Sequence, residues 1–442
     1  MSRENWGSRF GYIMAATGFS VGLGNIWRFP YLAGSNGGGA FIFVYILICF
    51  FICIPLLTME ISLGRKTQLN PIEGMRSITN RGSVWVSFGW LGIITAFIIL
   101  TYYIQIMGWI LIYLFKTLFG SFSLINNNSV SFNDITSNTV LVIGATFICV
   151  IIVGVISAKG LEKGIEKACK FMMPALLIML IILAIRSLTL PNSLEGLKWY
   201  LTVDFSMING QVLLAALGQG FFSIGIACGG AFVYGSYLNR NSNIPEDATL
   251  IVGLDTLIAF LAGLVIFPAI FAMGLEPNSG PSLLFVTMAN LFSNLPAGIF
   301  FGVIFYLLIF FAAITSAIGY LEPIVMTCTE LFNFKRITAV LLSLTLIFLA
   351  GLPMIKAHGS WSEILIGGKN FFEFADYLSG NILMPLGALI LAFYTLLVWK
   401  FEKYKDETNI GTNKYKINNW WSFFIKYLLP ISIILIFVTG IK

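Results

Sequence analysis

Two apolar stretches of this chain are interrupted by glycine and carry groups that could bind a ligand. They are residues 18–25, GFSVGLGN, and residues 220–230, GFFSIGIACGG. Each glycine in a helix costs about 1 kcal/mol relative to alanine, so these segments open easily. An opened turn frees backbone carbonyls, which bind a hard cation, and backbone amides, which bind a carboxylate. The two stretches therefore predict one site for a cation together with an anionic group.

Close packing of helices through small residues is the other reading of a glycine-rich stretch, and it is common in membranes. Two features favour a binding site instead. Asn25 ends the first stretch and Arg28 follows it closely, and a second broken stretch accompanies the first. Unwound backbone at membrane depth is tolerated only where it is buried in protein or lines a cavity. We therefore expect the two breaks to face each other.

The elements that carry these stretches must be solvated mostly by lipid. Of the 442 residues, 58% are hydrophobic, 15% aromatic and only 10% charged, whereas a soluble domain has about a quarter charged residues. The six cysteines lie in or beside apolar runs without a CxxC pair, and the one histidine, His358, lies in a loop. This inventory argues against a disulfide framework, a zinc site and Ser/His/Asp or Cys/His catalysis. The net charge of +6 resides in loops and is no sign of nucleic-acid binding.

The apolar runs predict an all-α integral membrane protein with about eleven transmembrane helices, because a spanning helix needs about 20 apolar residues. We treat residues 1–442 as a single domain. The runs are 10–33, 39–64, 84–116, 139–157, 171–190, 211–237, 248–274, 295–329, 337–354, 373–399 and 418–440.

Basic residues collect in the loops of one side of this arrangement. Arg65 and Lys66 follow the second run, Lys159 and Lys163 follow the fourth, and Lys335 follows the eighth. By the positive-inside rule that side is cytoplasmic. The sequence thus predicts a multi-pass protein of the cell inner (plasma) membrane with a cytoplasmic amino terminus and an external carboxyl terminus.

The broken runs are the first and the sixth, so they lie five spans apart. An odd offset reverses the direction of equivalent helices, which is the pattern of an inverted repeat. We predict a 5+5 repeat with broken helices 1 and 6, formed by residues 9–190 and 211–399, and one extra helix at 418–440.

These residues and their neighbours resemble the neurotransmitter:sodium symporter family. The resemblance begins at Asn5-Trp6, runs through residues 22–30, GLGNIWRFP, and 36–41, NGGGAF, and extends over nearly the whole chain. It continues at residues 55–60, 64–65, 163–167, 219–237, 261–268 and 315–316. The missing twelfth span and the short external loops are similar to those of bacterial members.

The resemblance implies a central site for one amino acid and two sodium ions. The first ion would bind the Ser20 carbonyl, Asn25, Ser223, Asp255 and the substrate carboxylate. The second ion would bind the carbonyls of Gly18, Val21 and Ala312 and the hydroxyls of Thr315 and Ser316. Without the resemblance, these two hydroxyls could simply bond to their own helix. The implied substrate pocket comprises Ser20, Leu23, Gly24, Ile99, Tyr103, Phe222, Ser223, Gly225, Cys228, Ser316 and Tyr320.

The resemblance also implies two gates. Arg28 and Asp376 would pair as the external gate, and a charge placed beside the break requires such an acidic partner. Tyr103 would bond the substrate carboxylate, and Phe222 would cover the pocket. The internal gate would consist of Arg3, Trp6, Tyr237, Glu322 and Glu330, where Glu330 replaces the aspartate usual in the family.

Asp255 and Ala259 depart from the pattern of the animal members, which carry a neutral amide and, one turn later, a serine. A buried carboxylate costs about 3 kcal/mol in the membrane unless a cation neutralises it. We therefore expect transport that needs sodium but not chloride, with Asp255 as the fixed anion.

Cys228 and Gly225 leave less wall around the pocket than large side chains would. This favours an aromatic amino acid, tyrosine first, over leucine or another aliphatic one. A sensor that binds without transporting would have the same site. A channel is disfavoured because polar groups cluster in mid-membrane, and an enzyme because Glu60, Asp255 and Glu322 lie on separate helices. The oligomeric state is not predicted.

Overall fold

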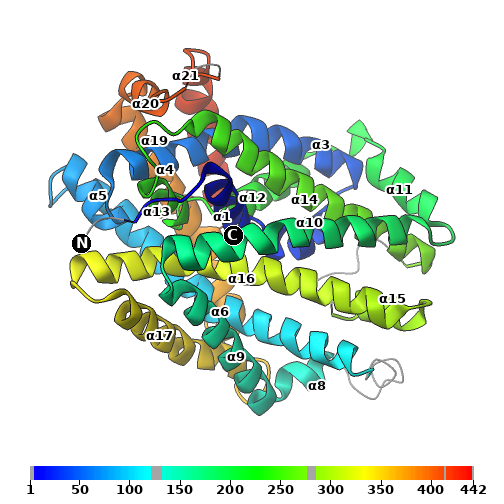
Figure 1. Cartoon of the computed structure of the whole chain (residues 1–442). Helices are drawn as coiled ribbons and strands as arrows, with labels where there is room; N and C mark the ends of the chain where they lie inside the picture. Colours follow the sequence, from blue (N-terminus) through cyan, green and yellow to red (C-terminus); the bar gives the residue numbers. More distant parts are fainter. Residues whose placement is uncertain (1–3, 121–131, 276–284, 413–414, 441–442) are drawn as a thin grey trace.

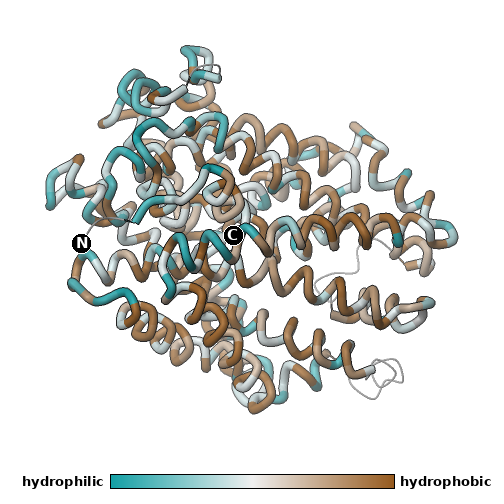
Figure 2. Tube along the Cα trace, viewed as in Figure 1, coloured by the Kyte–Doolittle hydropathy of each residue, from teal (hydrophilic) through white to brown (hydrophobic). Residues whose placement is uncertain are grey.

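The protein is all-α, as predicted, in a computed structural model that describes residues 4–120, 132–275, 285–412 and 415–440. Helices occupy most of this part of the chain (Figure 1). Its one β-type pairing is an isolated bridge between Ile366 and Lys369. The hydropathy pattern follows the length of the helices, with apolar residues along their middles and polar residues at the ends and in loops (Figure 2).

Nine segments among the described residues are long and apolar enough to cross a membrane. Two more segments, described below, are interrupted, which brings the number to the predicted eleven. The main helices of the nine are α3 (Gly39–Ile48) with α4 (Ile54–Thr67), α6 (Ser87–Leu118), α9 (Thr139–Ala158), α10 (Lys167–Leu188), α14 (Ile244–Ala272), α16 (Gly298–Leu331), α17 (Arg336–Lys356), α18 (Phe371–Tyr377) with α19 (Met384–Tyr394), and α22 (Leu429–Gly440).

The two interrupted segments are the predicted ones. The first consists of α1 (Arg9–Ser20), the π-helical turn η1 (Gly24–Arg28) and α2 (Phe29–Ser35). The second consists of α12 (Gly210–Ile224) and α13 (Gly230–Ser236). Gly225, Ala227 and Gly229 between α12 and α13 have φ angles of +67°, +62° and +75°. A left-handed backbone suits glycine, which has no Cβ to clash, so these glycines end one helix and let the other begin.

The fifth span differs from its predicted bounds. It begins at Leu161 rather than at residue 171, because the polar turn η4 (Leu161–Glu166) continues directly into α10. Hydropathy alone does not detect such a turn at a membrane surface. Short helices in the connections were also not predicted; they are α5 (Pro71–Ile78), α8 (Phe132–Ser137), α11 (Ser193–Leu201), α15 (Thr287–Asn294) and α20 (Phe401–Thr408).

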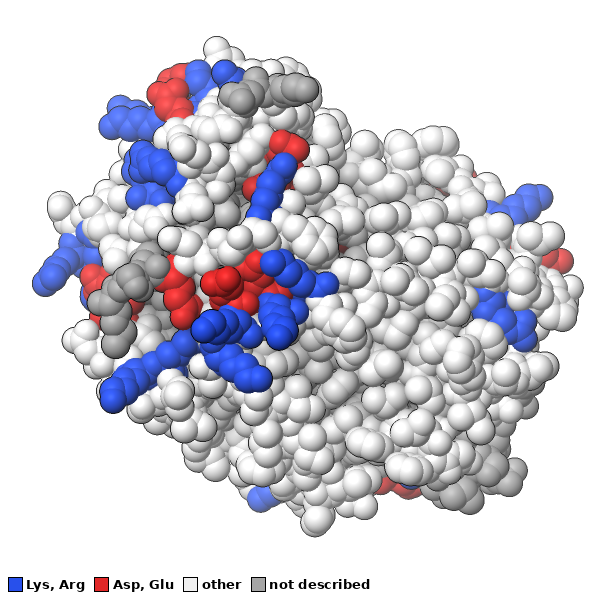
Figure 3. All heavy atoms as spheres, viewed as in Figure 1, with Lys and Arg blue, Asp and Glu red and all other residues white. Residues whose placement is uncertain are grey.

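Charged side chains gather at one end of the bundle (Figure 3). We call it the basic end and define it by Arg65, Lys66, Lys159, Lys163 and Lys335; the other end is the opposite end. The predicted placement of the basic end in the cytoplasm stays a prediction. The same holds for the repeat boundaries 9–190 and 211–399 and for the single-domain assignment of residues 1–442.

Candidate functional site

The carboxylate of Asp255 lies at the break of the first span. Asp255 on α14 is fully buried and accepts hydrogen bonds from Asn25 Nδ2 at 2.9 Å and from Ser223 Oγ at 2.8 Å. Tyr45 donates a longer bond of 3.5 Å. Asn25 Oδ1 in turn accepts from the amide of Gly22 at 3.1 Å. Three of the residues predicted for the first sodium ion, Asn25, Ser223 and Asp255, therefore meet, each brought by a different span.

This carboxylate has a negative charge without a positive partner in the described part of the chain. No Lys or Arg there comes within 4.0 Å of Asp255. A buried charge without a counter-charge is strongly unfavourable. Neutral oxygen atoms together with one carboxylate form the kind of site that fits a small cation. Ser20, the fourth predicted member, is buried beside the break at the end of α1, where its own hydroxyl bonds to the Thr17 carbonyl.

A second group of oxygen atoms joins α1 to α16. Ser316 Oγ lies 3.2 Å from the Gly18 carbonyl and 3.1 Å from the Val21 carbonyl. The Thr315 hydroxyl donates within its own helix, to the carbonyls of Phe311 at 3.1 Å and Ala312 at 3.0 Å, which is the local bonding that the sequence alone also allows. All five predicted members of the second sodium site are buried, and each offers a neutral oxygen atom as a ligand. Two of the three carbonyls, those of Gly18 and Val21, come from the last turn and the C-cap of α1, so the end of α1 positions this group.

Tyr103 on α6 connects the break to the predicted substrate pocket. Its hydroxyl accepts a hydrogen bond from the Leu23 amide at 3.4 Å. A Cβ on Gly22 would lie 2.7 Å from this hydroxyl and 2.6 Å from Ser316 Oγ, so only glycine allows the close approach. Ile99, one turn before Tyr103 on the same helix, is buried. Phe222 packs against Gly24, with a ring carbon 3.1 Å from where a Cβ would stand.

Phe19 corrects the expected shape of this pocket. Its ring lies 2.7 Å from the position of a Cβ on Gly225, and it also fills the space beside Gly230 and Gly319. The room inferred from Gly225 is therefore occupied by a side chain of α1. Tyr320 packs against this ring with centroids 5.0 Å apart. Sequence reading missed Phe19 because a missing side chain on one helix does not reveal which residue of another helix takes its place.

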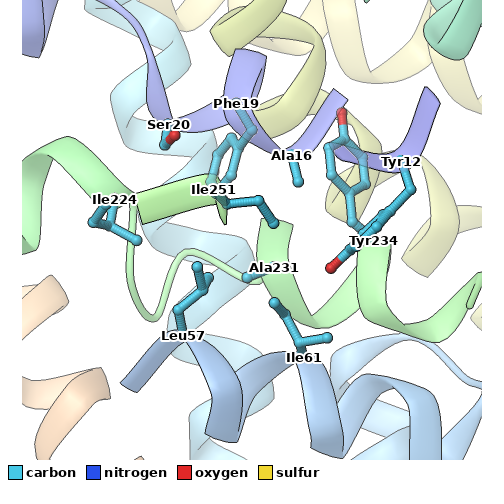
Figure 4. Close-up of a pocket in the computed structure, with 10 residues that line it drawn as sticks. All are labelled: Tyr12, Ala16, Phe19, Ser20, Leu57, Ile61, Ile224, Ala231, Tyr234 and Ile251. Atoms are coloured by element: carbon cyan, nitrogen blue, oxygen red, sulfur yellow. The ribbon is translucent and has the colours of Figure 1, made fainter. Parts of the chain in front are cut away.

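A small cavity lies between the two breaks and α4. Its volume is about 10 Å³, which is the space of about one water molecule. Figure 4 shows Phe19 and Ser20 of α1 on one side, with Ile224 and Ala231 on the two sides of the second break. The core is therefore closed toward the basic end, where Tyr12 and Tyr234 complete the lining.

Two polar side chains outside the predicted pocket hold the breaks open. Gln219 on α12 donates from Nε2 to the Gly24 carbonyl at 2.8 Å. Glu60 on α4 accepts from the amide of Ala227 at 3.0 Å and from that of Phe232 at 3.4 Å. The Glu60 bonds satisfy amides that an unbroken helix would have satisfied internally. The Gln219 bond is additional, because the Gly24 carbonyl also accepts from the Phe29 amide within η1. In the sequence, Gln219 was recognised only as part of the family pattern. Glu60 was recognised as part of that pattern and as an isolated acid.

The predicted inner gate gains a member at the basic end. Glu322 on α16 is fully buried and accepts from Tyr237 at 2.8 Å. Arg336, the first residue of α17, donates to both oxygens of Glu322 at 2.8 and 2.6 Å. Arg336 also donates to the carbonyl of Ser157 at 2.8 Å. Trp6 bonds the Tyr234 carbonyl through its indole nitrogen at 2.9 Å. In the sequence Arg336 counted only as a charge of a basic loop.

Arg3, predicted as the cation of this gate, lies outside the described residues. Glu330 reaches the start of α5, where the amide and the side chain of Asn70 donate to it at 2.6 and 2.8 Å. Glu330 therefore anchors a short helix at the basic end.

The predicted external pair is not formed. Asp376 is exposed, and its carboxylate is not within 4.0 Å of Arg28. The Arg28 guanidinium instead lies over the ring of Phe222, 4.5 Å from its centroid. It also borders a pocket of about 340 Å³ between α12, α22 and residues 380–381. In this structure the aromatic ring therefore takes the place of the acid beside the Arg28 charge, and the pairing of Arg28 with Asp376 as a gate stays a prediction.

His358 lies near this end, in an aromatic cluster beyond the end of α17. Its ring is 4.9 Å from that of Trp109 and 5.0 Å from that of Phe372, both edge to face. Burial lowers the pKa of His358, and the charge of Glu373 opposes this shift. The imidazole is therefore held neutral by its apolar surroundings.

Comparisons with known proteins agree with this geometry. The sequence model of the sodium:neurotransmitter symporter family matches residues 3–140 and 128–442. The uncharacterized sodium-dependent transporter YhdH of Bacillus subtilis (strain 168) is 38% identical over 98% of this chain and 96% of its own. A sodium-dependent serotonin transporter of Drosophila melanogaster is 27% identical over 100% of this chain and 76% of its own. The crystal structure of MhsT in complex with L-phenylalanine superposes with a TM-score of 0.90, at 35% identity, over 99% of this chain and 100% of that one.

Proposed function

This chain belongs to the sodium:neurotransmitter symporter family, and we propose that it imports an aromatic amino acid with two sodium ions, without chloride, by alternating access. Sodium-coupled symport across a membrane, rather than catalysis, is the activity of the family. The number of ions, the chloride independence, the substrate and the direction are the proposal. In this proposal the basic end and the amino terminus lie in the cytoplasm, and the carboxyl terminus lies outside.

The single observation that carries the proposal is the buried carboxylate of Asp255. It has hydrogen-bond donors on two sides, and among the described residues no Lys or Arg forms an ion pair with it. A sodium ion at this point would neutralise it, and the carboxylate of an amino acid would complete the oxygen set near the Leu23 amide. Ser20, Asn25 and Ser223 would share that ion. Sodium and substrate would therefore bind as neighbours, which couples their transport.

The second ion would lie among the carbonyls of Gly18, Val21 and Ala312 and the hydroxyls of Thr315 and Ser316. A sodium ion there would be held by no charged ligand, because all five ligands are neutral. It would tie α1 to α16 while bound. Its release would free α1 to move away from the core, which is the step that opens the basic end.

Chloride independence follows from the charge balance at Asp255. Two sodium ions and a zwitterion bring two positive charges, and Asp255 supplies one fixed negative charge inside the protein. Ala259, one turn later on α14, has no hydroxyl to donate to a chloride ion. The converse predicts that replacing Asp255 by Asn and Ala259 by Ser together makes transport depend on chloride.

An aromatic substrate is supported by two features. Cys228, which we predict in the wall of the pocket, is a small and fully buried side chain, and the similar transporter MhsT has been crystallised with L-phenylalanine. Phe19 limits the size, because its ring fills the space beside Gly225. We therefore place a benzene-sized side chain beside Cys228 and Tyr320. A leucine-like substrate is the alternative, and it would be favoured if Tyr320 turned toward the pocket.

Uptake of radiolabelled tyrosine and phenylalanine into proteoliposomes tests this function. The purified protein should accumulate label only with an inward sodium gradient, and equally in chloride and gluconate. Competition by unlabelled leucine, phenylalanine, tyrosine and tryptophan then ranks the substrates. Sodium-dependent binding without accumulation would contradict transport, and a preference for leucine would contradict the aromatic assignment.

Variants at three positions separate the parts of the proposal. Asp255→Asn should abolish sodium-driven uptake in gluconate, whereas the double variant with Ala259→Ser should regain uptake in chloride. Phe19→Ala should leave the sodium dependence intact and shift the preference toward tryptophan, because it opens the space beside Gly225. An unchanged ranking in Phe19→Ala would show that its ring does not limit the substrate.

A further inference from the structure

A groove on the outside of the bundle runs between α9 and α17. Its volume is about 400 Å³, and Thr345 is the one polar residue in its lining. Gly154 forms its floor, where a Cβ would meet the end of the Leu344 side chain at 2.9 Å. Phe147 and Phe348 close the end of the groove away from Ala158, with ring centroids 5.7 Å apart. This surface belongs to neither of the ion sites nor to the substrate pocket.

The length of the groove matches one leaflet of a bilayer. Its α9 wall extends from Phe147 to Ala158, which at 1.5 Å per residue is roughly 17 Å. The hydrocarbon core of a bilayer is about 30 Å thick, so a leaflet is about half of that. On α17 the wall extends from Ile337 to Leu349. A single acyl chain that enters at the Ala158 end would therefore be covered along its whole length.

Exposed lysines stand at the Ala158 end. Lys159 follows the last residue of α9, and Lys335 immediately precedes α17. The hydrogen bond of Arg336 to the Ser157 carbonyl holds these two helix ends together. In the described ranges neither lysine forms an ion pair within 4.0 Å. Figure 3 shows Lys and Arg gathered where α10 and α17 begin.

Two acids lie near these charges, and neither pairs with them. Glu4 accepts from the Leu161 amide at 2.6 Å, beside Lys159, but within the described ranges it forms no ion pair with either lysine within 4.0 Å. Glu162, the closest acid in the sequence, turns toward Gly7, with its carboxylate 3.2 Å from the position of a Cβ there. Lys163 beside it is exposed. The first amides of α17 also have no side-chain cap, since Lys335 makes no capping bond. Uncapped helix amides and lysines together favour a phosphate group.

We propose that this groove binds an anionic phospholipid of the leaflet at the basic end. One acyl chain lies between α9 and α17, and the phosphate lies beside Lys159 and Lys335. A second copy of this chain is a poorer occupant. A symmetric dimer through the groove would place both sets of lysines at the same membrane surface facing each other. The lipid instead brings the negative charge that this end lacks.

Binding should be measured on the full-length protein in nanodiscs. Phosphatidylglycerol and phosphatidylcholine with identical acyl chains are compared, and native mass spectrometry counts retained lipid molecules and protein copies. The wild type should retain phosphatidylglycerol and melt at a higher temperature in it than in phosphatidylcholine. Each basic residue near an anionic surface strengthens the attraction about fivefold. Lys159→Gln with Lys335→Gln should therefore weaken phosphatidylglycerol binding about thirtyfold.

A matched control and two groove variants complete the test. Lys116→Gln with Lys198→Gln removes equal charge at the opposite end and should leave lipid binding unchanged. Gly154→Leu and Ala158→Leu fill the two halves of the groove, and each should release the lipid while sodium-driven uptake still reports a folded protein. Equal retention of both lipids by the wild type, or unchanged retention by both filled variants, would overturn the proposal. A dimer that the filled variants dissociate without loss of lipid would also overturn it and make the groove an interface between copies.

Discussion

At the basic end a guanidinium meets a carboxylate in two hydrogen bonds, whereas at the opposite end the corresponding guanidinium rests on an aromatic ring. Arg336 and Glu322 are joined at 2.8 and 2.6 Å, and Glu322 is fully buried. Arg28 lies over Phe222, and Asp376 is left exposed. A buried bidentate pair is strong and directional, whereas a stack on an aromatic ring gains about 0.5–2 kcal/mol. The two ends are therefore closed with unequal strength, and the basic end is the more tightly held.

Removing the buried carboxylate should have the largest effect. Glu322→Gln keeps the shape but leaves the Arg336 charge without a partner, which costs about 3–5 kcal/mol for a buried pair. The protein should lose stability and spend more time open at the basic end. Cys169 reports this opening, because it is fully buried on α10, one turn after Glu166, which packs against Gly11 of α1. With the other five cysteines replaced, its rate of thiol labelling should rise.

The control for this experiment uses the opposite end. Asp376→Asn removes a carboxylate that is exposed and lacks an ion pair to Arg28, so Cys169 labelling should stay at the wild-type rate. Equal labelling of the Glu322→Gln and Asp376→Asn proteins would contradict the inequality of the two ends.

A conservative change of the cation should have an intermediate effect. Arg336→Lys retains the charge, but an ammonium cannot reach both oxygens of Glu322 and the Ser157 carbonyl in the same geometry. Losing a hydrogen bond to a charged group costs about 1.5–3 kcal/mol. The melting temperature should fall less than in Glu322→Gln. A double variant, Arg336→Lys with Glu322→Gln, should be no worse than Glu322→Gln alone, because the two residues act as one unit.

Changing Arg28 should have a smaller effect on stability and a larger one on transport. Arg28→Gln removes the contact with the Phe222 ring, which is worth about 0.5–2 kcal/mol. Uptake at low substrate concentration should decrease clearly, whereas the melting temperature should fall only slightly. The effect on uptake is expected because Phe222 also packs against Gly24 at the break. A fall in melting temperature as large as that of Glu322→Gln would remove the contrast between the ends.

The smallest expected effect is on the pH dependence at the opposite end. Burial lowers the folded-state pKa of His358 below its ordinary value of 6.5. The folded state therefore binds its proton less readily than the unfolded state. The stabilisation is complete above pH 6.5 and is lost as pH falls from there toward the folded pKa. The melting temperature of His358→Gln should decrease less between pH 7 and pH 5 than that of the wild type, and identical slopes would contradict the burial of this imidazole.

Much of the fold could be predicted because the membrane leaves few choices. Long apolar runs must be helices, and glycine clusters inside them must be breaks, so both interrupted spans were found. The residues around Asp255 were placed by their resemblance to a known pattern. Arg336 was missed because its partner Glu322 lies on another helix and nothing local marks the contact. The contact of Arg28 with Phe222, rather than with Asp376, was not predicted because charge alone does not tell whether an acid or an aromatic ring is nearer.

Phe19 on α1 packs against three glycines, Gly225 at the end of α12, Gly230 on α13 and Gly319 on α16, and this packing restricts how the protein can evolve. Enlarging Gly225 or Gly319 alone would overpack the core at a cost of about 1–3 kcal/mol. Shrinking Phe19 alone would leave a cavity costing about 3–5 kcal/mol unless a ligand fills it. Single steps in either direction are therefore disfavoured. Homologues that acquire a new substrate should therefore carry paired substitutions. A smaller side chain at position 19 should accompany a larger one at position 225 or 319, so that these positions covary.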